Sequence, residues 1–105
     1  MVEEILRNAG VTNKECRFIK APKTTYAVWF DSFRRRGADR RNCIYEHDST
    51  IELYAYAPDE AAEEKIEYEL DKRAVEFAKQ ERSWIESEQL YMTIYEFSYV
   101  SKEAI

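Results

Sequence analysis

Hydrophobic residues recur with a helical period in two parts of the chain. Near the N-terminus they are three or four residues apart, as on one face of a helix, at Val2, Ile5, Leu6 and Ala9. Gly10 follows where a left-handed residue would end such a helix, so we predict a helix over residues 2–9. A second apolar stripe follows Pro58, a residue that suits the first turn of a helix. Its members are four residues apart, at Ala62, Ile66, Leu70 and Ala74, and they predict an amphipathic helix over residues 58–73.

Alternating hydrophobic residues indicate strands in the rest of the chain. Residues 24–30 carry apolar side chains at both odd and even positions, so this strand is expected to be central or covered on both faces. Residues 43–56 alternate with a period of two, and their odd positions are expected to face the core. Two more strands are predicted at 75–82 and 90–100, with a turn or short helical cap at 83–88. The order α-β-β-α-β-β predicts an α+β fold with an antiparallel sheet of about four strands.

The composition indicates a single folded domain, residues 1–105. That length is typical of one domain, and two glycines and two prolines leave no linker to divide it. Hydrophobic residues make up 45% and aromatic residues 14% of the chain, which excludes an intrinsically disordered protein. No apolar run approaches the ~18 residues that a membrane span needs. The acidic start is unlike a secretory signal peptide, so we expect a soluble domain that does not bind membranes.

Positive and negative charges are separated along the chain. Residues 17–41 hold eight basic and two acidic side chains, a net charge of +6, whereas residues 42–105 hold six basic and sixteen acidic ones, a net charge of −10. The polar segment 31–42 is predicted to be a loop that pivots at Gly37. It contains five arginines, which are Arg34, Arg35, Arg36, Arg40 and Arg41.

Several roles for this arginine-rich loop remain open. Guanidinium groups form bidentate hydrogen bonds with carboxylates and phosphates, so the loop could bind an acidic protein, another copy of the chain or nucleic acid. It could equally be a solvated loop without a partner. The sequence pI near 5.0 argues against a dedicated nucleic-acid-binding protein.

The strand predicted over residues 90–100 is apolar on both faces, and such a strand needs cover on both. In one interpretation the two helices provide that cover. In the other, part of its aromatic face packs against another subunit. The candidate contact residues of that face are Tyr91, Tyr95, Phe97 and Tyr99.

Catalytic and metal-binding signatures are absent from the sequence. Cys16 and Cys43 are interpreted as small core residues, and His47 is the only histidine. Cys43 and His47 share one face of a predicted strand, but their spacing is not that of a zinc site, so no metal is expected. No glycine-rich phosphate loop is present, and nothing in the sequence supports pairing either cysteine with His47 as nucleophile and base. We therefore expect no cofactor and no enzymatic activity.

Six segments, taken in order and spacing, resemble a known family over nearly the whole chain. They are residues 24–28 (TTYAV), 36–39 (RGAD), 51–54 (IELY), 81–85 (ERSWI), 88–91 (EQLY) and 95–102 (YEFSYVSK). The family is that of the small tail-terminator proteins of long-tailed bacteriophages and prophages, also called tail-completion or head–tail joining proteins. None of the six segments is a catalytic signature.

The resemblance implies an α+β subunit that assembles into a ring, commonly of six copies, without a cofactor or a catalytic residue. Such a ring caps the head-proximal end of the tail tube and receives the head connector on its other face. The implied partners are the chain itself, the tail tube protein and the head connector, and the implied location is the tail or neck of a virion made in a bacterial host's cytoplasm. The implied ring would contact DNA only where DNA passes through its lumen. The alternative is a small prophage-encoded binding module or regulator whose arginine-rich loop binds an acidic protein or nucleic acid.

Overall fold

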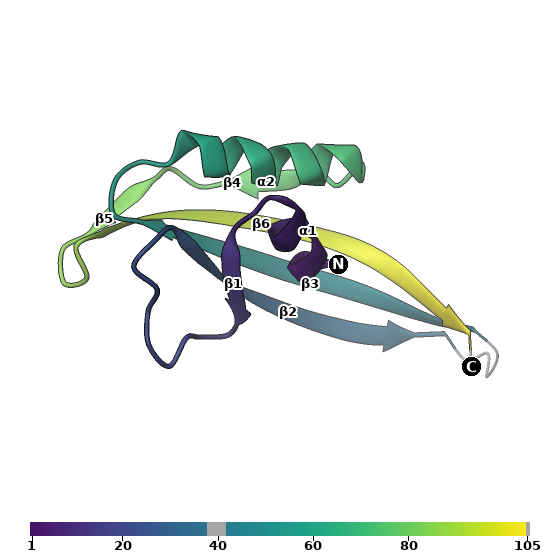
Figure 1. The fold of residues 1–105 in the computed structure, drawn as a ribbon. Helices are drawn as coiled ribbons and strands as arrows, with labels where there is room; N and C mark the ends of the chain where they lie inside the picture. Colours follow the sequence, from purple (N-terminus) through teal and green to yellow (C-terminus); the bar gives the residue numbers. More distant parts are fainter. Residues whose placement is uncertain (38–41, 105) are drawn as a thin grey trace.

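The computed structural model describes residues 1–37 and 42–104, and it confirms the α+β fold (Figure 1). Its two helices are α1 (Val2–Asn8) and α2 (Glu60–Lys72). Its strands are β1 (Thr12–Glu15), β2 (Tyr26–Arg36), β3 (Asn42–Ala55), β4 (Phe77–Lys79), β5 (Ser83–Ile85) and β6 (Leu90–Ala104). They form one six-stranded sheet in the order β1-β2-β3-β6-β4, with β5 also paired to β6. Strand β1 runs parallel to β2, and the other pairs are antiparallel.

The four predicted strands are present as β2, β3, β4 and β6 and pair antiparallel, but the sheet has six strands rather than four, and the additional strand β1 runs parallel to β2. Strand β1 was missed because its residues are polar and mostly exposed, and it forms by backbone pairing with β2. Strand β5 occupies part of the segment assigned to a turn or helical cap, where it pairs with the start of β6. Strand β4 covers only three of the residues predicted at 75–82. Strand β2 continues through the predicted loop to Arg36, since residues 31–36 pair one by one with residues 44–49.

Both helices lie on the same face of the sheet, which we call the helix-side face (Figure 1). The odd positions of the long strands point to this face, so the predicted inward face of residues 43–56 is confirmed at Ile51, Leu53 and Ala55. The fully buried side chains of the core come from both layers and include Val2, Ile5, Leu6, Ile51, Ile66, Leu70 and Tyr95. The opposite face, which we call the open face, carries no helix formed by the described residues.

Strands β2, β3 and β6 extend together beyond the helices, toward the end of the sheet where the C-terminus lies (Figure 1). We call this three-stranded extension the arm, and define it as residues 32–36, 44–48 and 98–102, which pair across the three strands. The arm contributes to a longest molecular dimension of 49 Å. Strand pairing rather than a hydrophobic core therefore holds this part of the protein together.

The two helices end in the same type of turn with different residues at its left-handed position. That residue is Gly10 (φ 73°) after α1, as the sequence predicted, and Ala74 (φ 55°) after α2. In both turns the residue after the left-handed position donates its backbone N–H to a carbonyl of the last helical turn. Val11 donates to the carbonyl of Leu6 over 2.9 Å, and Val75 donates to that of Leu70 over 3.0 Å. The second helix thus ends with a side chain at a position that favours glycine.

Exchanging these residue types is expected to change stability in opposite directions. Ala74→Gly should raise the free energy of unfolding by about 0.5–1 kcal/mol because it relieves the left-handed strain, whereas Gly10→Ala should lower it by about 1 kcal/mol. A Cβ at Gly10 would meet no atom within 4 Å, so that loss reports backbone strain alone. Urea unfolding of both variants measures the two effects, and changes of the same sign would contradict the assignment.

Candidate interaction surface

A chain of hydrogen bonds crosses the helix-side face at the arm, from β2 through β3 to β6. Nδ1 of His47 lies 3.0 Å from Oδ2 of Asp31, and Nε2 of His47 lies 2.9 Å from Oγ of Ser101. Ser49 also donates to Asp31 over 3.0 Å, and the ring of Tyr99 stacks on the imidazole with 4.3 Å between centroids. In the tautomer that carries its proton on Nδ1, the imidazole donates to the carboxylate and Nε2 accepts from the Ser101 hydroxyl.

The order Asp–His–Ser is also that of a hydrolase triad. Such a triad further requires hydrogen-bond donors aimed at the oxyanion that forms beside the serine. Ser101 lies within a strand, where backbone N–H groups lie in the plane of the sheet and not above it. The arrangement of Asp31, His47 and Ser101 is therefore best explained as a network that ties the three strands of the arm together.

The arm separates the predicted arginines. Arg34 and Arg36 lie on the open face and share the carboxylate of Glu46, with N–O distances of 2.9 and 3.1 Å. The hydrogen bond from Arg34 and the charge of Arg36 hold the pKa of Glu46 below its usual value. Arg35 is exposed at the alternate position of the strand, on the helix-side face, and Arg40 and Arg41 lie outside the described residues. The register also places Asp48 and Lys102 on this face, so the open face of the arm carries three basic and two acidic side chains, an excess of one positive charge.

The aromatic residues predicted for subunit contact divide between core and surface. Tyr95 and Phe97 are buried under the helices, with exposed fractions of 0% and 5%, so their assignment to a subunit contact is wrong and the helices provide their cover. Tyr91 and Tyr99 are half-buried and lie near opposite ends of the same strand face. Phe33, which the sequence analysis did not select, is 61% exposed on the helix-side face of the arm. It was overlooked because its segment was expected to be a loop.

The arm has two strand edges that are free of partners within the described residues. Strand β1 pairs with β2 only at residues 26–29, which leaves the outer edge of residues 30–36 free. Strands β4 and β5 pair with β6 only at residues 95–97 and 90–92, which leaves the edge of residues 98–104 free. Free strand edges pair readily with another chain. The arm therefore offers hydrogen-bonding edges as well as charge.

A pocket of about 300 Å³ lies at the other end of the open face. Its aromatic wall consists of Phe18, Tyr26 and Tyr54, with centroids 5.4 Å apart for the first pair and 5.2 Å for the second. Glu52 and Glu88 contribute carboxylates to the lining, and Tyr54 donates to Glu52 over 2.9 Å. No sequence pattern pointed to this pocket, because hydrophobic residues recur with no clean period over residues 11–23.

Cys16 also lines the pocket and is exposed, so its assignment to the core was wrong. It follows β1 with a left-handed backbone (φ 68°), and its N–H bonds the carbonyl of Trp29 over 2.9 Å. The chain leaves the sheet at this turn, which places the thiol at the surface.

A buried ion-pair cluster lies beneath α2. The carboxylate of Glu63 is 5% exposed and receives two hydrogen bonds from Arg82, of 2.9 and 3.1 Å. Lys79 approaches the same group to 2.9 Å, and Thr93 donates to it over 3.3 Å. Burial disfavours the charged form of Glu63, but the hydrogen bonds from Lys79 and Arg82 outweigh that effect and hold its pKa below its usual value. Every oxygen of this carboxylate is paired, so the cluster is structural.

Comparison with known proteins assigns no family. No protein-family model matches the chain, and no curated protein matches it significantly in sequence. Among the described residues, no three His, Cys, Asp or Glu side chains gather as metal ligands. In the same part of the chain, no helix is long and apolar enough to cross a membrane.

Proposed function

We propose that the chain is a structural assembly protein of the tail-terminator type and has no enzymatic activity. Copies of it form a ring, of about six, which caps the head-proximal end of a phage tail tube and presents the surface that joins tail to head. Its partners are other copies of itself, the tail tube protein and the head connector, and its place is the tail or neck of the virion.

The arm is the observation that carries this proposal. It combines two free strand edges with exposed arginines, and none of these features serves the core of its own subunit. An extension of this kind is suited to contact with a neighbouring subunit or with the end of the tube. The acidic residues that it would meet belong to residues 42–105, whose net charge is −10, or to the tube protein.

Reversing the charge of the arm should abolish assembly without unfolding the subunit. We expect the triple variant Arg34→Glu, Arg35→Glu, Arg36→Glu to lose ring formation and tube capping, because like charges then face the acidic partner. These side chains are exposed, so the circular dichroism spectrum should not change. The matched control reverses three exposed lysines outside the arm, Lys14, Lys65 and Lys72, and should assemble normally.

Light scattering after size exclusion, at several protein and salt concentrations, measures assembly directly. The expected mass of the unmodified protein is near six times the 12.6 kDa of one chain, and high salt should dissociate the ring. Normal assembly of the triple variant would refute the role of the arm. A chain that stays monomeric alone and with tail tubes, but binds DNA with a steep salt dependence, would establish the alternative binding module.

A further inference from the structure

The pocket on the open face has the chemistry of a site for a cationic side chain. Tyr26 and Tyr54 are stacked in its wall, and aromatic faces attract ammonium and guanidinium groups. Glu52 and Glu88 add two carboxylates, which exceed the single positive charge of Arg17 in the lining. The hydroxyl of Tyr54 donates to one oxygen of Glu52, which leaves the second oxygen available to a ligand.

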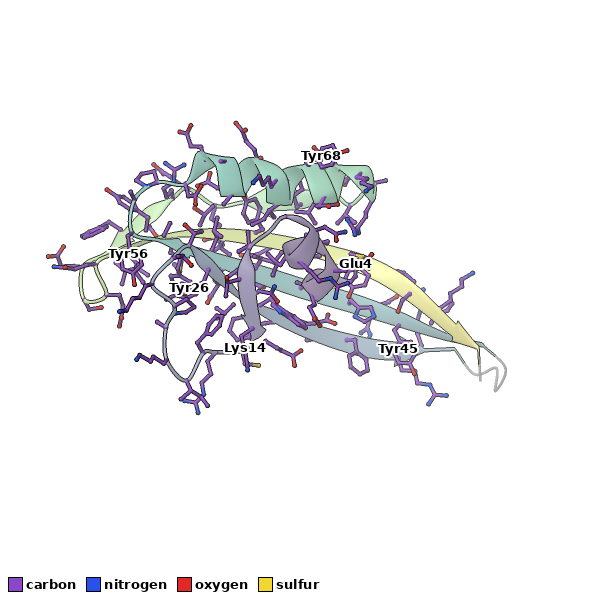
Figure 2. All side chains as sticks on the ribbon, viewed as in Figure 1. Glu4, Lys14, Tyr26, Tyr45, Tyr56 and Tyr68 are labelled. Atoms are coloured by element: carbon purple, nitrogen blue, oxygen red, sulfur yellow. The ribbon has the colours of Figure 1, made fainter. Side chains whose placement is uncertain are left out.

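Arg34 and Arg36 of the arm lie on the same face as the pocket but cannot reach the pocket of their own chain. Arg34 is eight residues from Tyr26 along β2, which corresponds to about 27 Å at the rise of a strand. Figure 2 shows the corresponding separation between Tyr26, at the pocket, and Tyr45, which pairs with Arg35 in the arm. A guanidinium from the arm can therefore fill only the pocket of a second copy.

The arm can offer one arginine without leaving a carboxylate unpaired. Arg34 and Arg36 share Glu46, and their side chains are 80% and 64% exposed. If one guanidinium turns to a neighbouring molecule, the other still pairs with Glu46. The chain thus carries a donor of positive charge at one end of the open face and an acceptor at the other.

We propose that the pocket formed by Phe18, Tyr26, Tyr54, Glu52 and Glu88 binds an arginine, Arg34 or Arg36, from the arm of a second copy. This inference rests on the proposed self-assembly and names the surface that the arm meets. Two copies could satisfy both pockets reciprocally as a closed dimer, or each arm could engage the next copy around a ring.

Cross-linking through Cys16 tests this contact, because that thiol lines the pocket. In a Cys43→Ser background, Arg34→Cys should form a disulfide with Cys16 of a second copy under mild oxidation, seen as a dimer or ladder on a non-reducing gel. The controls are the background alone and Tyr68→Cys, on the outer face of α2 and 66% exposed. A cross-linked yield no higher than in these controls would overturn the proposal.

A charge change in the pocket gives an independent measurement. Glu88→Lys should weaken self-association about tenfold, because a cation then occupies the acceptor. The control Glu76→Lys changes another exposed glutamate, outside the pocket, and should associate normally. Equal association constants for the two variants, or a chain that remains monomeric at every concentration, would overturn the proposal.

The mass of the cross-linked species separates this inference from the proposed function. A ring held by disulfides between Cys16 and the cysteine introduced at position 34 supports both. A closed dimer with the cross-link supports the contact and contradicts the ring, whereas a ring without the cross-link supports the ring and overturns the contact.

Discussion

Arg82→Met is expected to lower the free energy of unfolding by about 3 kcal/mol, although Arg82 lies outside every regular element. The substitution leaves the buried carboxylate of Glu63 with Lys79 as its only cation. A buried charge that loses a partner is costly, whereas removal of both charges is much less so. The double variant Glu63→Gln, Arg82→Met should therefore lose less stability than the two single variants lose together. Urea unfolding of the unmodified protein, the two single variants and the double variant measures this coupling energy.

The pH dependence of stability provides a second readout of the same cluster. The pKa of Glu63 is lower in the folded chain than in the unfolded chain, so its stabilisation is present above the unfolded value of about 4.3 and is lost as the pH falls through the folded value. As the pH falls from about 4.3 through the folded value, the unmodified protein should lose stability more steeply than Glu63→Gln. Parallel curves would show that the carboxylate does not contribute as a charge.

Leu70→Ala alone is expected to lower the free energy of unfolding by about 3 kcal/mol. Leu70 lies on the inner face of α2, is 0% exposed and packs in the core with Ile66 and Tyr95. Its truncation removes apolar contacts and leaves a cavity that the rigid sheet beneath cannot fill. Thermal or urea unfolding measures the loss.

Tyr68→Ala is the matched control on the same helix. Tyr68 lies on the outer face of α2, points away from the sheet in Figure 2, and should contribute less than about 0.5 kcal/mol. Equal losses for the two variants would contradict the packing of α2 against the sheet. A small loss for Leu70→Ala alone would show that the core rearranges to fill the cavity.

The sequence predicted those parts of the fold that bury a hydrophobic pattern. The helix starting at Val2, its end at Gly10, the stripe that includes Leu70 and the alternation around Ile51 each report a surface hidden from water. The missed strands β1 and β5 bury little, and they form because their backbone groups find partners on β2 and β6. Pairing between distant strands leaves almost no trace in the local pattern of side chains.

The candidate site was predicted in composition but not in arrangement. The arginine cluster is visible in the sequence, yet its assignment to a loop concealed that Arg34 and Arg35 alternate between faces of a strand. For the same reason Asp31 could not be connected with His47, although position 47 was expected to point inward. The pocket depends on how residues 16–25 fold back on Tyr26, which only the tertiary structure determines.

The position of β6 has a consequence for how the protein is made. This strand is the last regular element along the sequence, yet it pairs with β3 on one side and with β4 and β5 on the other. While a ribosome is still synthesising residues 90–104, the nascent chain has a hairpin of β2 and β3 with one unpaired edge and a helix α2 with no complete sheet to cover. The sheet can close only after residues 90–104 have left the ribosome, so the hairpin and α2 must wait for β6 before they are covered, and chaperones would find their substrate in that interval.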